Sequence, residues 1–527
     1  MLLGLFSAHA THAVNVQSPP LYESVLVTPG TLADRTLGAR ISVSGSTAAV
    51  VALADNSSST GSVYLYDAQE DWRLITELNS ASNKDNFGQN IILQNNILII
   101  SADRDDQGAG AVYIFERLSP ASPEPWQKTA KITAPDKSTG TRFGGAIAWV
   151  DNVLYIGAPE HDQGKVYIFQ RDSESGQWLF QENMVPDDPQ ALAFGSSIAQ
   201  DGEFLIVGAP YTDANDNLEP ETKSRKTAHS TRQGRFAISK GDTVDPGLES
   251  GAIFVYQRTQ GVWQQTARLG ASNRETGDHL GTQIVIEGDT IVASLKQKDV
   301  FDFLRGGALY IYKKAGNDWL EHAALFPEEN NVGANFGNSF TLLDKHILVG
   351  ANKIHFNGFN SGQAYLYAQN SSGIWELKYQ QHNAEIKGHD QFGLGVALGQ
   401  EYMLAASKNA VFVFQDTPVN YHPAAFYPAS NTLQLNEVSV NGLGVLRADF
   451  HLTQQEGEFI LSLRDAYERT DIELGEINYL NSAELLVIPR LAVAQSNGGS
   501  AFFSATLQQI PNPSAVQFRV VSLIPLD

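Results

Sequence analysis

The sequence predicts an all-β protein whose larger part consists of seven copies of one four-stranded unit. A pair formed by an aromatic residue or leucine and a glycine recurs seven times, in steps of 50, 56, 51, 86, 56 and 56 residues. An apolar run ends in small residues fourteen positions after the first residue of each pair, and two aromatic residues at positions i and i+2 follow it. Aromatic residues favour strands. Units of this length cannot bury their apolar faces alone, so we expect the copies to stack on one another.

Each unit is expected to begin with a strand at the aromatic-glycine pair. The pairs are Leu37-Gly38, Phe87-Gly88, Phe143-Gly144, Phe194-Gly195, Leu280-Gly281, Phe336-Gly337 and Phe392-Gly393. A second strand ends at the small residues, most fully at Gly157-Ala158-Pro159 and Gly208-Ala209-Pro210. Turn residues such as Asp151-Asn152 and Gly288-Asp289 predict that a tight hairpin joins the two strands.

The third strand carries the two aromatic residues, which share one face because side chains alternate along a strand. The seven aromatic pairs are Tyr64/Tyr66, Tyr113/Phe115, Tyr167/Phe169, Phe254/Tyr256, Tyr310/Tyr312, Tyr365/Tyr367 and Phe412/Phe414. A tryptophan then starts the fourth strand in six units, at Trp72, Trp126, Trp178, Trp263, Trp319 and Trp375. We expect these rings to form the core between neighbouring units.

Four-stranded antiparallel units repeated seven times predict a seven-bladed β-propeller over residues 14–416. The seventh unit has no tryptophan strand of its own. Tyr22 lies 15 residues before Leu37, the spacing that separates Trp72 from Phe87. We therefore expect the N-terminal segment to supply the outer strand of the last blade and close the ring, which removes an exposed sheet edge.

The succession of Phe-Gly, Gly-Ala-Pro and Gly-x-Val-Tyr-x-Phe over about residues 22–414 resembles the FG-GAP repeats of integrin α-subunit propellers and of bacterial extracellular proteins. The resemblance is closer to the bacterial type. It implies an extracellular interaction protein. Metal-binding integrin-type blades carry a calcium loop between the first two strands, but here the spacing leaves only a two- or three-residue turn. The resemblance therefore does not transfer calcium binding, and we expect no cofactor.

Three further segments interrupt or flank the repeats. Residues 1–13 resemble the end of a secretory signal peptide, which predicts a secreted, periplasmic or cell-surface protein. An insertion over residues 211–249 lies in blade four; two interpretations remain open for it, a mobile solvated loop or a hairpin that binds an anion or a partner. Its basic residues, the candidate partner-binding residues, are Lys223, Arg225, Lys226, Arg232, Arg235 and Lys240.

The sequence pattern of the last hundred residues differs from that of the repeats. Prolines mark a linker over residues 417–430, and alternating apolar residues over 431–527 predict a small C-terminal β-sandwich-like domain. Residues 438–440, 459–463 and 516–521 show this alternation. An accessory or packing role is the expectation for this domain.

Composition and motifs narrow the function. The net charge is −22, which disfavours nucleic acid as a partner, and no apolar stretch is long enough to span a membrane. The sequence holds no cysteine and none of the common catalytic motifs. The densest acidic cluster, Asp103, Asp105 and Asp106, is a candidate cation site.

Two functions of different classes remain. One is an exported, non-catalytic protein that mediates interaction or adhesion with an unknown protein or glycan through its propeller loops. The other is a hydrolase-type enzyme with a site assembled at the central channel, since propellers build sites from loops far apart in sequence.

Overall fold

The chain divides into two compact units in the computed structural model. The first consists of Tyr22–Leu398 and Met403–Val413, and the second of Met1–Leu21, Gly399–Tyr402 and Phe414–Asp527. The structure describes residues 22–28, 35–54, 61–80, 84–118, 125–188, 190–213, 249–296, 306–327, 333–355, 359–370, 372–381, 388–399, 402–414, 424–427, 432–440, 444–455, 458–469, 477–480, 485–494, 500–510 and 517–525.

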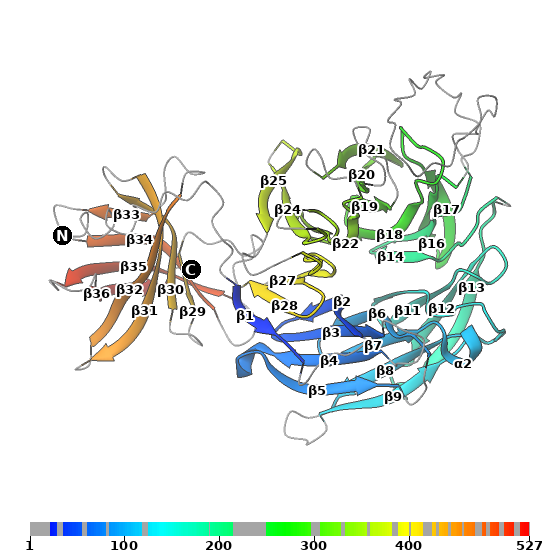
Figure 1. Ribbon diagram of the computed structural model, residues 1–527, viewed down its shortest axis with the longest axis horizontal. Coiled ribbons are helices and arrows are strands. Elements are labelled where there is room, and N and C mark those ends of the chain that lie inside the picture. The colour runs from blue at the N-terminus through cyan, green and yellow to red at the C-terminus, as the bar shows by residue number, and fades with distance from the viewer. Residues whose placement is uncertain are drawn as a thin grey trace. The chain divides into compact units, whose positions relative to one another are not determined.

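The first unit consists of seven four-stranded sheets that follow one another round a ring (Figure 1). The first four sheets are β2 (Arg35–Ser44), β3 (Thr47–Ala54), β4 (Ser62–Asp67) and β5 (Arg73–Asn79); β6 (Phe87–Gln94), β7 (Ile97–Ala102), β8 (Ala111–Arg117) and β9 (Trp126–Ile132); β10 (Ala146–Val150), β11 (Val153–Ala158), β12 (Lys165–Arg171) and β13 (Trp178–Met184); and β14 (Ser197–Asp201), β15 (Phe204–Ala209), β16 (Ala252–Thr259) and β17 (Val262–Leu269). The last three are β18 (Leu280–Glu287), β19 (Thr290–Leu295), β20 (Ala308–Ala315) and β21 (Asp318–Leu325); β22 (Phe336–Leu343), β23 (His346–Ala351), β24 (Gln363–Gln369) and β25 (Trp375–Gln381); and β26 (Val396–Leu398), β27 (Met403–Ala406), β28 (Val411–Phe414) and β1 (Tyr22–Leu26). The predicted seven-bladed β-propeller is confirmed.

The aromatic residues form the core, as their alternation predicts. In blade three the ring of Phe143 packs edge-to-face on Tyr167 and Phe169, with centroids 5.3 and 6.2 Å apart. All three rings lie in one apolar cluster with aliphatic residues of the preceding blade, among them Ile99 and Ile114. The aromatic face of one blade therefore packs on the aliphatic face of its neighbour, and this burial holds the ring together.

The glycine pattern has a physical cause that the spacing alone does not reveal. Gly110 has a φ of 83° and forms a parallel bridge with Phe143 of the next blade. A Cβ atom at Gly110 would lie 2.0 Å from the carbonyl oxygen of Phe143, and one at Gly157 would lie 2.0 Å from that of Gly195. Neighbouring blades thus approach backbone to backbone, and only glycine leaves room for this contact.

The ring closes between the seventh and the first blade. Strand β1 occupies the outer position of the seventh sheet, beside β28, which is where the spacing of Tyr22 places it. The amide of Leu37 donates to the carbonyl of Lys408 over 3.0 Å. A Cβ atom at Gly395 would lie 2.1 Å from the oxygen of Gly38, so the backbones approach as closely here as at the other blade junctions.

The second unit forms a single eight-stranded sheet, and its strands are β29 (Ala424–Tyr427), β30 (Thr432–Val440), β31 (Gly444–Gln455), β32 (Glu458–Arg469), β33 (Ile477–Leu480), β34 (Leu485–Ala494), β35 (Ser500–Ile510) and β36 (Gln517–Pro525). Its order is β29-β30-β31-β32-β36-β35-β34-β33, with parallel pairings β29–β34 and β30–β33 that join its two ends. Phe450 and Phe518 are buried and meet edge-to-face. The predicted C-terminal β domain is present; its hydrogen bonds connect all described strands in one sheet, whereas a sandwich divides them between two.

Candidate functional site

The two faces of the propeller differ in the length of their connections. In six blades the first hairpin turns within two residues: 45–46, 95–96, 151–152, 202–203, 288–289 and 344–345. A calcium loop has no room in these turns. The connections between second and third strands and those between blades all emerge on the opposite side of the ring, because the strands of a blade are antiparallel. We call this side the loop face.

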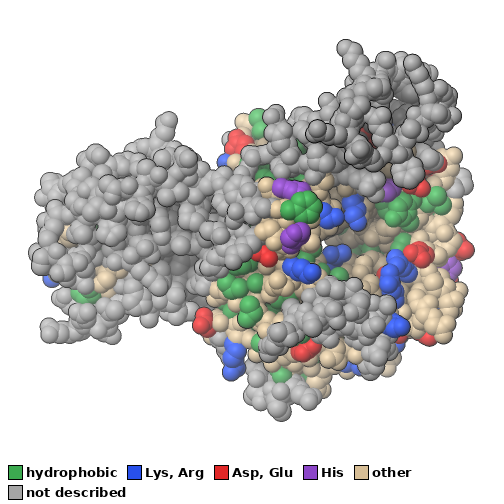
Figure 2. All heavy atoms as spheres, viewed as in Figure 1, with side chains coloured by type: hydrophobic (Ala, Val, Ile, Leu, Met, Phe, Trp, Pro, Cys, Tyr) green, Lys and Arg blue, Asp and Glu red, His purple; other side chains and the backbone are tan. Residues whose placement is uncertain are grey.

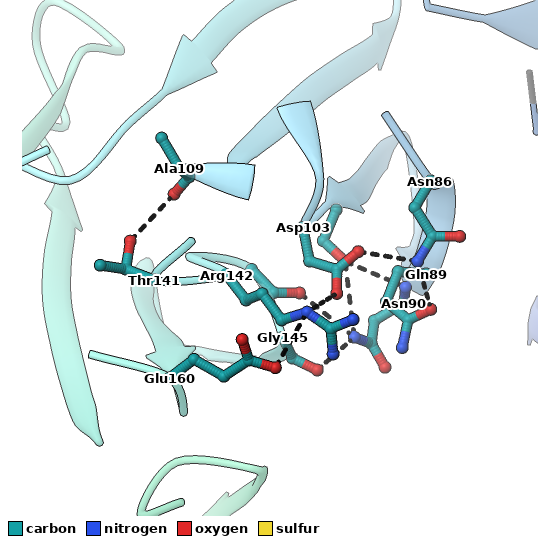
Figure 3. A network of polar contacts seen from close by, with 11 residues as sticks. Asn86, Gln89, Asn90, Asp103, Ala109, Thr141, Arg142, Gly145 and Glu160 are labelled. Carbon is teal, nitrogen blue, oxygen red and sulfur yellow. Dashed lines mark hydrogen bonds and ion pairs between the residues drawn. The ribbon is translucent and has the colours of Figure 1, made fainter. Parts of the chain in front are cut away.

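A polar network lies on the loop face where blades two and three meet (Figure 3). Asp103 follows strand β7 and its side chain is only 3% exposed. Its Oδ1 accepts a 2.7 Å hydrogen bond from the amide nitrogen of Asn86, and its Oδ2 lies 3.8 Å from Nε of Arg142. Burial raises the pKa of Asp103, and the Asn86 hydrogen bond opposes that rise.

Arg142 is the central residue of this network. It precedes the aromatic-glycine pair of blade three and has a φ of 54°. Its Nε lies 3.2 Å from Oε1 of Glu160, whose side chain is 54% exposed. Its amide donates to the oxygen of Gly108, and Thr141 Oγ1 donates to the oxygen of Ala109 (Figure 3). Contacts between the two blades thus hold Arg142 between a buried and an exposed carboxylate.

The same geometry recurs elsewhere in the ring. The residues that precede six of the aromatic-glycine pairs all have positive φ values between 54° and 60°: Asn86, Arg142, Ala193, His279, Asn335 and Gln391. In blade six Asn335 donates to Asn352 Oδ1 over 2.7 Å, at the same separation of 17 residues as Asn86 and Asp103. Sequence reasoning missed this contact, although the repeated spacing is a signal that could have revealed it.

Beside this network lies a pocket of about 330 Å³. Its lining comprises Lys84, Arg104, Gln107, Gly108, Gly140, Arg142 and Glu160. Three cations and one carboxylate therefore border it, in a chain whose net charge is −22. Figure 2 shows Lys and Arg side chains round the hollow in the middle of the propeller. The pocket is a local region of positive charge on an acidic protein, and it favours an anionic ligand.

The three carboxylates of the candidate cation site point to different partners. Asp103 contacts Asn86 and Arg142, as described above. Asp105, in the single turn α2 (Asp105–Gly108), accepts from Tyr113 and lies 2.7 Å from Nζ of Lys131. Asp106 pairs with Lys137. Within the described ranges, no three His, Asp or Glu side chains come together in a way that could hold a metal ion.

The candidate partner-binding residues of the blade-four insertion, Lys223, Arg225, Lys226, Arg232, Arg235 and Lys240, lie outside the described residues. The loop face has exposed aromatic side chains that sequence reasoning did not single out. Phe359 is 60% exposed, and its ring centroid lies 4.5 Å from that of His355 and 5.4 Å from that of His389. Tyr211 is 47% exposed and meets His279 edge-to-face. No motif marks these residues, because the chain brings them together only through the fold.

Comparison with known proteins agrees with the repeat pattern. Residues 126–169 and 319–367 match the FG-GAP repeat family. The chain thus carries FG-GAP repeats, and the resemblance seen in the motifs is confirmed. No curated protein matches the chain. Among solved structures, it is similar to the WD40 domain of Toxoplasma gondii coronin, with 8% identity, 77% of this chain and 90% of that chain covered, and a TM-score of 0.42.

The fold and the repeats place this protein in the class of FG-GAP β-propellers. In general, this fold supports a protein-interaction domain. In the part of the chain that the structure describes, no helix has the length and apolar character needed to cross a membrane.

Proposed function

We propose that this protein is exported and non-catalytic, and that it binds a protein or glycan partner through the loop face of its propeller. The observation that carries the proposal is the basic pocket between blades two and three, which opens on the face that bears the longer connections. Loops on a rigid scaffold commonly supply binding residues. Localisation outside the cytoplasm rests on the signal-like residues 1–13.

The contacts of the acidic residues support a binding role over a hydrolytic one. A general acid or base must lie within hydrogen-bond reach of the substrate. Asp103 and Asp105 are buried, and their oxygens are engaged by Asn86, Tyr113 and Lys131. Glu160, the exposed carboxylate at the pocket, pairs with Arg142. Asp103 and Glu160 thus meet Arg142 where blades two and three adjoin, and Asp105 is engaged within blade two.

Site-specific photo-cross-linking tests the proposal. A photo-reactive amino acid replaces Gln107, which is exposed at the pocket, or Lys345, which is exposed in a two-residue turn on the opposite face. Both full-length variants are incubated with envelope extract or extracellular medium of the producing cell and then irradiated. We expect a discrete adduct from position 107 and none from position 345.

Two outcomes would contradict the proposal. Adducts of equal yield from both positions, or from neither, would remove the loop face as the binding surface. Turnover in a broad hydrolase screen, lost on mutation of a residue at the central channel, would show that the protein is an enzyme instead.

A further inference from the structure

We infer that the pocket bordered by Lys84, Arg104 and Arg142 binds an oxyanion, a carboxylate or a sulfate, carried by an acidic polysaccharide. This inference rests on the proposed function, because it names the ligand of the same loop face. The shared chemistry is a negatively charged oxygen group on a sugar ring.

The charges of the pocket point to an anion. Lys84 and Arg104 are exposed and, among the contacts of the described residues, neither forms an ion pair. Arg142 is the third cation, and the buried carboxylate of Asp103 holds it in place. Its guanidinium has five donors in a rigid fork, which suits the paired oxygens of a carboxylate or sulfate. The pocket therefore offers two cations, Lys84 and Arg104, without an ion pair among the described residues, beside Arg142, which pairs with Asp103 and Glu160.

Glu160 occupies part of this site in place of the ligand. Its Oε1 lies 3.2 Å from Nε of Arg142, and its side chain is 54% exposed, so a ligand that reaches the guanidinium displaces a partly solvated carboxylate. An incoming oxyanion competes with this carboxylate for the same guanidinium. Glu160 thus acts as an internal competitor, and its removal strengthens binding.

Two features favour a sugar over an acidic peptide. The pocket measures about 330 Å³, which lies in the range of small-molecule sites and exceeds what one side-chain carboxylate fills. The same face exposes the flat rings of Phe359 and Tyr211, against which the apolar faces of sugar rings stack. A polysaccharide repeats its charged rings, and a polymer that extended from the pocket over the loop face would gain affinity from each further ring contact.

Binding of defined polymers to the full-length protein tests the inference. The probes are polygalacturonate, which carries carboxylates, dextran sulfate, neutral dextran and poly-glutamate. We expect binding of at least one acidic polysaccharide and none of dextran. Lys84→Gln/Arg104→Gln weakens this binding by about tenfold or more, since each removed cation contributes a charge-assisted contact.

A control variant separates a specific site from general charge attraction. Lys128→Gln/Lys345→Gln has the same net charge but changes exposed lysines on the outer strand β9 and in a turn on the opposite face. We expect this variant to bind as the unmodified protein does. We also expect Glu160→Gln to tighten binding severalfold. All five side chains are exposed, so folding is checked simply by an unchanged melting temperature.

The polymers that bind identify the source of the oxyanion. Binding of polygalacturonate alone assigns a carboxylate, binding of dextran sulfate alone assigns a sulfate, and each supports the inference. Tighter binding of poly-glutamate than of either polysaccharide would overturn it in favour of an acidic peptide. Equal weakening in the control variant, or no binding of any probe, would also overturn it. If the inference of an acidic polysaccharide fails in this way, an adduct from position 107 in the cross-linking experiment would still support the proposed function.

Discussion

Replacing Gly110 by alanine tests whether the repeated glycines are required by the contact between neighbouring blades. Gly110 has a φ of 83°, and its amide donates to the carbonyl oxygen of Asp105 over 2.9 Å. A Cβ atom there would lie 2.0 Å from the oxygen of Phe143 and 2.7 Å from its nitrogen. Both are backbone atoms, so no side-chain rotation relieves the overlap.

Two costs add in this variant. A left-handed φ costs an alanine about 1–2 kcal/mol, and overpacking costs about 1–3 kcal/mol. The propeller unit of roughly 390 residues loses about 0.8 kcal/mol of stability per degree near its melting temperature. We therefore expect Gly110→Ala to lower the melting temperature by about 3–6 °C.

Gly277→Ala is the matched control. Gly277 has a φ of 78°, but apart from Gly277 and its two chain neighbours no atom of the described residues lies within 4 Å of the position that an added Cβ would occupy. Only the conformational cost of about 1–2 kcal/mol applies, which corresponds to a fall of about 1–3 °C. Circular dichroism melting curves of both variants measure the difference. Equal shifts would refute the claim that blade contact is the reason for the glycine pattern.

Three further predictions concern closure, metal and pH. Leu26→Ala in β1, a residue only 1% exposed, is expected to cost about 2–5 kcal/mol and lower the melting temperature by about 3–6 °C, and deletion of residues 14–30 is expected to do more; an unchanged midpoint would contradict closure by β1. Chelation by EDTA is expected to leave the melting temperature unchanged, whereas a fall reversed by calcium would reveal a structural ion. Burial opposes ionisation of Asp136, but hydrogen bonds from Lys165 and Tyr167 lower its pKa to about 2. Because the pKa of Asp136 in the folded protein lies below its ordinary value, the ionised carboxylate stabilises the fold. The unmodified protein is therefore expected to have a larger free energy of unfolding than Asp136→Asn above about pH 4, and this difference is expected to disappear as the pH falls through about 2. Urea unfolding at several pH values measures the difference, and a difference independent of pH would contradict the prediction.

The propeller could be predicted from the sequence because each blade repeats the same local requirements. The ring of Phe143 needs partners two residues apart on a neighbouring strand, and Gly110 needs the absence of a side chain. Requirements of this kind recur at fixed spacing and are visible in a single chain. The C-terminal unit has no repeat, so alternation predicted its strands but not the pairings that join β29 to β34.

The basic pocket could not be predicted in the same way. Lys84, Arg104, Arg142 and Glu160 come from four separate connections, and no local motif joins them. Their proximity follows from the stacking of blades two and three. The acidic cluster from Asp103 to Asp106 was conspicuous in the sequence, yet its side chains turn to different partners because neighbouring strands supply Tyr113 and Lys131. The sequence shows that this segment is acidic, but only the fold shows which groups face one another.

Hydrogen exchange measured on the full-length protein with and without its captured partner tests the loop face most directly. We expect slower exchange in segments 103–110, 134–142 and 159–164, which surround the pocket, when the partner is bound. The turns at 95–96 and 151–152 on the opposite face are expected to exchange at an unchanged rate. Protection of those turns, with no change round the pocket, would contradict the claim that this protein binds through its loop face.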